Sequence, residues 1–284
     1  MTIAVAYLVG KKPEPFRRFL QSYEQHPAGI AHELVLVTNA WSAPLPAEIR
    51  EMIAMSGLRY FEATDVQFDL DAYYAAASQL DAEHFCFLNS YSEVLDDGWL
   101  AKLHAAILTP GVGLAGATGS YESHYSGYVE AAPGAARRTL SPLKLLRGVI
   151  NVFALRRDYD PFPNPHVRSN AFMIARETFL RIGGPRFRTK GETERVESGK
   201  RGLSRSVEQL GLAAVVAGRD GVVYPRERYR ESHTFRIGEQ CNLLVADNRT
   251  VEYANADAEE RRALRRLAWG DDADVRCPRC GGTS

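Results

Sequence analysis

The stretch HFCFLNSYSEVLDDGWLAKLHAAI, residues 84–107, contains the unit from which we predict the fold. Residues 84–88 form a short apolar run that is typical of a buried strand. Polar side chains follow at 89–93, and apolar residues then recur at the spacing of one helix face over 99–107. A strand, a polar turn and a helix in this order predict one repeat of an α/β sheet.

The same alternation extends over the first 120 residues. Strands that alternate with helices imply right-handed crossovers and a mainly parallel sheet covered on both faces. We predict strands at 3–9, 34–37, 59–63, 84–88 and 112–117, and helices at 16–23, 46–55, 70–77 and 99–107. The predicted fold class is therefore α/β, a doubly wound, mainly parallel sheet with helices on both faces.

The second half of the chain has a looser pattern. Residues 121–137 are rich in Tyr, Ser, Gly and Ala and are expected to form a long surface segment. The apolar stretch 143–155 carries basic residues and is expected to be a helix that covers the sheet, with membrane-surface contact as the open alternative. Further strands are predicted at 171–174 and 213–217, and helices at 176–182, 203–210 and 259–269, with the end of the last helix outside the core.

The composition excludes several classes of protein. Thirty-five Lys and Arg balance 35 Asp and Glu among 284 residues, so no overall field attracts a polyanion and nucleic acid is not an expected partner. No apolar run is long enough to span a membrane, and the N-terminal sequence leads into a strand pattern, so we expect a cytoplasmic location. The four cysteines suggest no disulfide framework, and Cys277 and Cys280 supply half of a zinc site or belong to a solvated tail.

Ligands of doubly wound sheets bind at the carboxyl ends of the strands. Neither GxGxxG nor GxxxxGK[ST] follows the first strand, and the polar cluster after residue 88 is the densest at this edge. The order of four segments resembles the family 2 glycosyltransferases of GT-A fold: Phe87-Leu88-Asn89, Gly98-Trp99-Leu100, Asn170 to Gly184, and Glu197 to Leu212. The resemblance covers residues 2–224 and is to a branch that lacks the D-x-D motif.

This resemblance implies transfer of a sugar from a nucleotide-diphosphate donor to a hydroxyl acceptor, a glycan or a lipid-linked molecule, with inversion. It places Glu197 at the position of the family's catalytic acidic residue, which implies a role as general base. Acceptor contacts are expected from Trp99 and Asn170. Donor contacts are expected from Val9, Lys11, Thr38, Asn39, Asp69, Tyr73, Asn89, Ser90, Tyr91, Arg168 and Lys190.

The metal-binding motif of that family is altered in this chain. Asn89 stands in place of its first Asp, and its metal-binding Asp falls near Tyr91, which leaves Glu93 as the nearest carboxylate. A Mg²⁺ or Mn²⁺ ion is then bound weakly, by Glu93 with His233, or is absent, because hard cations need carboxylate ligands. Without a metal, side-chain cations must neutralise the diphosphate; the candidates are Lys11, Lys12, Arg168, Lys190 and Lys200.

Two of these candidates have simpler structural interpretations. Glu197 alternatively belongs to a solvated face and pairs with nearby cations, which are Lys190, Arg195, Lys200 and Arg205. Asp69 alternatively is the N-cap of the helix that begins there. Both alternatives stay open at the level of the sequence.

We expect three parts: a nucleotide-sugar-binding half at 1–120, an acceptor-binding and catalytic half of the same domain at 121–235, and a C-terminal extension at 236–284. Residues 235–248 form either a flap on the active site or a segment that docks the terminal helix to the sheet. Two other functions are considered: a catalytically degenerate protein of this fold that binds a nucleotide or glycan or docks to a synthase, and a sugar nucleotidyltransferase. A homodimer and peripheral membrane contact also stay open.

Overall fold

The computed structural model describes residues 2–39, 44–64, 66, 68–137, 142–183 and 195–271. Three residues with roles predicted from the sequence lie outside these ranges: Lys190, Cys277 and Cys280. Within them, no helix is both long enough and apolar enough to cross a membrane.

Eight strands form one central sheet in the order β11-β10-β6-β9-β4-β1-β2-β3. All run in the same direction except β9 and β11. The strands are β1 (Ile3–Leu8), β2 (Glu33–Asn39), β3 (Arg59–Ala63), β4 (His84–Leu88), β6 (Val112–Gly116), β9 (Ala171–Ala175), β10 (Ala213–Ala217) and β11 (Val223–Pro225). This order confirms the predicted doubly wound, mainly parallel sheet.

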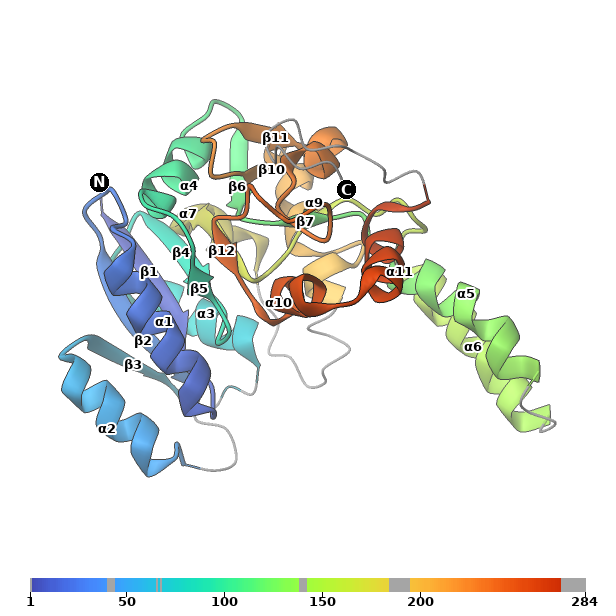
Figure 1. The fold of residues 1–284 in the computed structure, drawn as a ribbon, viewed down its shortest axis with the longest axis horizontal. Coiled ribbons are helices and arrows are strands. Elements are labelled where there is room, and N and C mark those ends of the chain that lie inside the picture. The colour runs from blue at the N-terminus through green and yellow to red at the C-terminus, as the bar shows by residue number, and fades with distance from the viewer. Residues whose placement is uncertain are drawn as a thin grey trace.

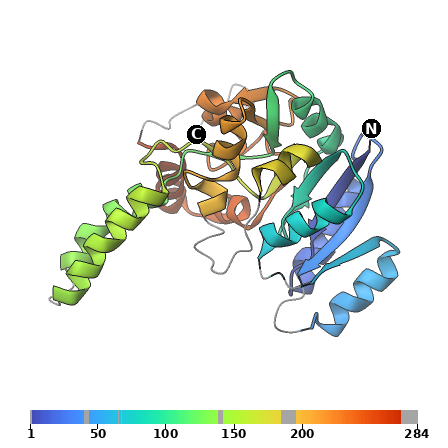
Figure 2. The same ribbon diagram turned by 180° about the vertical axis from the view of Figure 1, so that it is seen from behind.

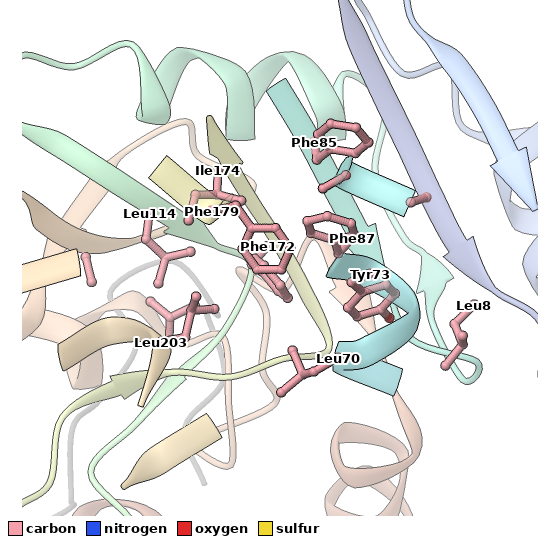
Figure 3. Close-up of a cluster of buried hydrophobic side chains, with 14 of the residues drawn as sticks. Leu8, Leu70, Tyr73, Phe85, Phe87, Leu114, Phe172, Ile174, Phe179 and Leu203 are labelled. Atoms are coloured by element: carbon pink, nitrogen blue, oxygen red, sulfur yellow. The ribbon is translucent and has the colours of Figure 1, made fainter. Parts of the chain in front are cut away.

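Helices cover both faces of this sheet (Figure 1). Side chains alternate along β4, so Phe85 and Phe87 enter one core while Cys86 and Leu88 enter the other. The first core contains side chains of α3 (Asp69–Gln79), α7 (Arg176–Ile182) and α9 (Leu203–Gln209), and the second those of α1 (Pro13–Gln25), α2 (Ala47–Ser56) and α4 (Trp99–Ile107). Figure 3 shows the first core, where the rings of Phe87 and Phe172 lie 5.2 Å apart.

Strand β9 enters the sheet antiparallel between β4 and β6, which the sequence pattern did not indicate. Its register pairs Ala171 with Leu88 and Phe172 with Gly116. The amino end of β9 therefore meets the carboxyl ends of its two neighbours. The strands β7 (Gly119–Ser120) and β8 (His166–Val167) pair beside this meeting point.

Helices α5 (His124–Arg137) and α6 (Pro142–Asp158) pack against each other as a hairpin that extends away from the sheet (Figures 1 and 2). The prediction of an irregular surface segment at 121–137 is wrong, because most of it is helical. The helix predicted at 143–155 is confirmed, but the expectation that it covers the sheet is wrong, because α6 packs against α5 and its described side chains Ile150 and Phe153 are exposed.

The C-terminal elements pack on the body of the protein. They are η1 (Arg226–Ser232), β12 (Val245–Ala246), which pairs with β5 (Glu93–Val94), α10 (Asn248–Asn255) and α11 (Ala258–Trp269). Trp269 lies in the first core and its Nε1 donates to the Phe235 carbonyl at 2.7 Å. The prediction that the end of this helix lies outside the core is therefore wrong, and residues 235–248 do dock the terminal helix. Cys241 in this segment is disulfide-bonded, which the sequence pattern did not indicate, whereas Cys86 is a free, buried thiol.

Candidate active site

Two asparagines are linked where the carboxyl ends of the parallel strands meet the amino end of β9. The backbone N–H of Asn89 donates to the Asn170 carbonyl at 3.0 Å, and the Ser92 hydroxyl donates to the same carbonyl at 2.8 Å. The Asn170 side chain accepts from the Thr118 hydroxyl and donates to the Val245 carbonyl at 3.2 Å. These bonds join the segments after β4 and β6 to β9 and β12, and so fix the edge of the sheet at which ligands are expected.

The turn after β4 is closed by the side chain of Asn89. Its Oδ1 accepts from the Tyr91 backbone N–H at 3.0 Å and from the Ser92 hydroxyl at 3.2 Å. The Ser90 carbonyl accepts a hydrogen bond from the Tyr7 hydroxyl at 3.0 Å, which ties the turn to β1. The predicted donor residues at 89–91 therefore form one fixed turn at this edge.

Glu197 is held at the same edge by Ser169, the neighbour of Asn170. Its Oε1 accepts from the Ser169 backbone N–H at 3.3 Å and from the Ser169 hydroxyl at 2.5 Å. The described cations that the alternative interpretation assigned to Glu197 bind other carboxylates, in the pairs Arg195–Asp158, Lys200–Asp160 and Arg205–Glu208. The contacts of Glu197 thus favour a place in the site over a place on an ion-paired surface.

Asp69 is the second acidic residue of this cluster. Its side chain is exposed, yet desolvation by the surrounding protein raises its pKa, and the negative charge of Glu197 raises it further. The Asp69 carboxyl group is therefore reachable from solvent, although protein atoms surround most of it. The N-cap interpretation of Asp69 is wrong, because Phe68 occupies the cap position and Asp69 is the first helical residue. A carboxyl group whose pKa is raised by desolvation and by a nearby acidic residue, as that of Asp69 is, is typical of functional sites.

The charge of Glu197 also acts on two buried side chains, Tyr73 and His166. The Tyr73 hydroxyl donates to the Leu88 carbonyl at 2.9 Å, and burial, followed by the charge of Asp69, raises the pKa of this tyrosine well above its usual value. Burial lowers the pKa of His166. Both side chains are therefore neutral at neutral pH, and Asp69 and Glu197 supply the acidic chemistry of the cluster.

Arg168, which precedes Ser169, forms a buried ion pair. Its guanidinium donates to Asp247 at 2.8 Å and to the Thr118 hydroxyl at 3.4 Å, and it lies 4.0 Å from the centre of the Phe235 ring. Burial alone raises the pKa of Asp247, but the charge of Arg168 and the hydrogen bonds to the carboxylate outweigh it and hold this pKa below its usual value. The predicted donor cation is at the edge, but its charge is already balanced by Asp247.

The remaining predicted donor residues lie around the ends of β1 and β2. Lys11 is exposed after β1, and Asn39 is the last residue of β2. Val9 is buried, and so is Thr38, whose hydroxyl is 2.8 Å from that of Tyr60. The donor contacts of these residues stay predictions.

Trp99 does not lie at the site. Its side chain is 0% exposed and belongs to the second core, so the prediction that it contacts the acceptor is wrong. The other predicted acceptor residue, Asn170, is 1% exposed and uses its side-chain amide to join Thr118 and Val245. Asn170 therefore shapes the edge of the sheet.

The residues predicted to bind a metal do not assemble as a metal centre. Glu93 Oε2 lies 3.8 Å from the guanidinium of Arg18, and His233 is buried at the end of η1. Among the residues that the structure describes, no group of three or more His, Cys, Asp or Glu side chains could hold a metal ion. Oδ1 of Asn89 is already engaged in its turn. The described side chains therefore do not fit a tightly bound Mg²⁺ or Mn²⁺ ion.

Sequence reasoning missed Ser169 and Asp247. Ser169 lies between two predicted residues, so its position in the chain was an available signal. Asp247 begins α10 as its N-cap and forms a capping box with Thr250. That pattern predicts a helix start but carries no information about a partner such as Arg168, which is 79 residues away.

The comparisons with known proteins give distant structural similarities. No family model and no curated protein matches the sequence. The fold aligns with mannosyltransferase PcManGT from Pyrobaculum calidifontis, in complex with GDP-Man and Mn²⁺, at a TM-score of 0.46 and 14% identity over 82% of this chain and 59% of that one. It also aligns with glucosyl-3-phosphoglycerate synthase from Mycobacterium tuberculosis (TM-score 0.37, 15% identity, 62% of this chain and 56% of that one).

A third solved structure, S. aureus TarS 1-349 in complex with UDP-GlcNAc, aligns at a TM-score of 0.32 and 13% identity over 41% of this chain and 34% of that one. This chain spans less than two thirds of the length of each of the three proteins.

Proposed function

We propose that the protein is a glycosyltransferase that moves a sugar from a nucleotide-diphosphate donor to a hydroxyl acceptor with inversion. The observation that carries this proposal is the carboxylate of Glu197, which Ser169 holds at the carboxyl edge of a doubly wound sheet and whose charge acts on Asp69. Ser169 fixes the carboxylate of Glu197, and the basic side chains around it are bound to other acids. An ordered carboxylate of this kind suits proton removal from a hydroxyl group.

In the proposed reaction, Glu197 is the general base. Ser169 holds Oε1, and Oε2 removes the proton of the acceptor hydroxyl while the acceptor oxygen attacks the anomeric carbon of the donor sugar. The bond between that carbon and the diphosphate oxygen breaks on the opposite side, and the diphosphate leaves with the bonding electron pair. General-base catalysis of this type contributes about 10²–10⁴-fold to a rate.

The leaving diphosphate needs positive charge close to it. We assign this role to Lys11 after β1, with Lys12, and to Arg18 of α1. Arg18 is half exposed, and its ion pair with Glu93 is long, at 3.8 Å. Its charge acts on Tyr7, whose hydroxyl donates a hydrogen bond to the Ser90 carbonyl of the site turn. Arg168 contributes less than the sequence suggested, because Asp247 balances it. No step is assigned to a metal ion.

We further propose that the acceptor is a glycan or a lipid-linked molecule and that the protein acts in the cytoplasm. We place the acceptor next to Glu197, because this residue would remove the proton of the acceptor hydroxyl. Glu197 lies beside the amino end of β9 and the base of the helical hairpin. We assign the donor contacts to Asp69 and to the turn at 89–91.

The test begins with binding. Thermal unfolding is measured with UDP, GDP and their sugar conjugates, and a ligand at about 100 times its dissociation constant should add about 2.7 kcal/mol to the unfolding free energy. Release of free nucleoside diphosphate is then followed for each stabilising donor, with candidate acceptors added. Wild-type release that is lost in Glu197→Gln, with donor binding kept, supports the proposal. Binding without release supports the degenerate alternative, and no stabilisation by any nucleotide overturns both.

A further inference from the structure

We propose that the hairpin of α5 and α6 binds an anionic membrane surface. In both views the hairpin extends from the body as an arm (Figures 1 and 2). Helix α6 has 17 residues and so is about 25 Å long. None of the described side chains of the arm belongs to either core, so core packing does not explain the apolar ones among them.

The first observation is exposed apolar surface on α6. Ile150 is 56% exposed and Phe153 is 72% exposed. The two residues are three positions apart, so they lie on neighbouring turns of the same helix face. Val129 of α5 is also exposed, at 39%. Exposed apolar side chains that adjoin one another, as Ile150 and Phe153 do on α6, mark an interaction surface.

The second observation is an uneven distribution of charge. The whole chain is neutral, but residues 124–158 contain six basic residues and two acidic ones: Arg137, Arg138, Lys144, Arg147, Arg156 and Arg157 against Glu130 and Asp158. The hairpin therefore carries a net charge of four positive. Glu130 pairs with Arg266 of the body, and Asp158 pairs both with Arg195 of the body and with Arg157 of the hairpin. Exposed apolar groups together with basic residues are the chemistry that binds an anionic lipid interface.

Charge complementarity also decides between a membrane and a second copy of the chain. Two hairpins that pack side by side bring two sets of four positive charges together, which opposes pairing. An anionic bilayer attracts the same charges, at about 1 kcal/mol for each basic residue near its surface. The anionic membrane is therefore the occupant that these residues fit.

The root of the hairpin contacts the segment that carries Glu197. The backbone N–H of Lys200 donates to the Asp158 carbonyl at 2.9 Å, its Nζ donates to the Arg156 carbonyl at 2.9 Å, and Arg195 pairs with Asp158 at 3.0 Å. Membrane binding by the hairpin would therefore hold the segment 195–200 close to the lipid surface. This link, which rests on the proposed function, favours a lipid-linked acceptor over a soluble glycan.

The test measures sedimentation of the full chain with vesicles. One set contains phosphatidylcholine alone, and the other an equal mixture of phosphatidylcholine and phosphatidylglycerol. We expect binding to the anionic vesicles, weaker binding to the neutral ones, and a decrease with added salt. Two double variants, Ile150→Asp with Phe153→Asp and Lys144→Glu with Arg147→Glu, should each lower the partition coefficient at least about tenfold.

The matched control lies on α2, on the body of the protein. Met55 is 86% exposed and Arg50 is exposed, so Met55→Asp with Arg50→Glu makes the same kinds of change and should leave vesicle binding unchanged. Thermal unfolding of every variant checks that the fold is kept. Because the assay contains no donor, and nucleotide binding is measured without vesicles, its result is independent of the proposed activity.

Three results would overturn the proposal. The first is equal binding to neutral and anionic vesicles, and the second is binding that survives both hairpin variants. The third is a concentration-dependent dimer of the wild type that the same variants dissociate, which would assign the exposed face to a second copy.

Discussion

Ser169 donates two hydrogen bonds to one oxygen of Glu197, from its backbone N–H at 3.3 Å and from its hydroxyl at 2.5 Å. This arrangement restrains the position of one carboxylate oxygen of Glu197 and leaves the other available to a substrate in the proposed reaction. Ser169 therefore acts as a positioning residue, and Glu197 is the group that takes the proton in the proposed reaction.

We expect Ser169→Ala to lower kcat about tenfold with an unchanged KM for the donor, because one of the two bonds is lost and the orientation of the base is relaxed. Glu197→Gln should lower kcat at least about 10²-fold. Steady-state release of nucleoside diphosphate measures both. Ser169→Thr keeps a hydroxyl and should retain most of the activity; a threonine variant as slow as the alanine one would argue against the positioning role.

The ion pair of Arg168 and Asp247 predicts a large effect on stability. Asp247→Asn leaves the buried guanidinium without its counter-charge, so the free energy of unfolding should fall by about 3–5 kcal/mol. Urea unfolding measures the change. Glu33→Gln is the matched control, because Glu33 pairs with Arg59 at 3.0 Å on the surface and should cost no more than about 1 kcal/mol. Similar losses in the two variants would contradict the prediction.

The same pair predicts how stability depends on pH. The pKa of Asp247 is lower in the folded state than in the unfolded chain, so its contribution is complete above the ordinary aspartate pKa of about 4. It is lost as the pH falls through the lower folded-state value. The difference in unfolding free energy between wild type and Asp247→Asn should therefore shrink in acid, and a difference that grows below about pH 4 would have the wrong sign.

The coupling of Asp69 to Glu197 can be measured directly. Because the charge of Glu197 contributes to the raised pKa of Asp69, Glu197→Gln should lower the pKa of Asp69 toward its ordinary value. Carbon-13 NMR titration of the aspartate carboxyls follows this shift, with Asp69→Asn to assign the resonance. Glu208→Gln, which removes a carboxylate bound to Arg205 and Arg226, is the control and should leave the Asp69 titration unchanged.

Chelation of divalent ions should have little effect on the reaction. The described acidic and histidine side chains form no cluster able to hold a metal, and we assign the diphosphate charge to Lys11 and Arg18. Nucleoside diphosphate release should therefore change less than about twofold in excess EDTA, whereas Arg18→Gln should weaken donor binding about tenfold. Complete dependence on added Mn²⁺, lost in Glu93→Gln, would instead restore the metal role predicted for Glu93.

Because β6 packs closely against β8, the losses of unfolding free energy in variants of Gly116 and Val167 should not be additive. A Cβ at Gly116 would clash with Cγ1 of the buried Val167, so Gly116→Ala should cost about 1–3 kcal/mol of unfolding free energy. Val167→Ala removes that methyl group and makes room for the new one. The double variant should therefore lose less stability than the sum of the single variants, and strict additivity would show that the two positions do not share this contact.

The pattern of apolar residues predicted the sheet of the first 120 residues because each strand and helix there is a local signal. It did not predict the direction of β9, since a five-residue apolar strand reads the same in both directions. For the helix at 143–155 the pattern predicted an apolar face but not its neighbour, and the structure pairs it with α5 rather than with the sheet.

The site was predicted in part for the same reason. Asn89 and Asp69 follow or begin predicted elements, so their place at one edge of the sheet could be inferred, whereas Glu197 was assigned to the site only by the family resemblance. The burial of Trp99 could not be inferred. An aromatic residue at the start of a helix gives the same sequence pattern whether its ring faces a ligand or the core. The pair of Arg168 and Asp247 depends on a contact between distant segments, which no local pattern records.

The direction of β9 also has a consequence for the order of events during folding. The site turn, Asn170 and Glu197 come from distant parts of the sequence and meet only after β9 has inserted between β4 and β6. Contacts of high sequence separation carry a large loop-closure cost and form late. A refolding chain should therefore recover helical structure before it assembles this site, and an incompletely synthesised chain would lack the site altogether.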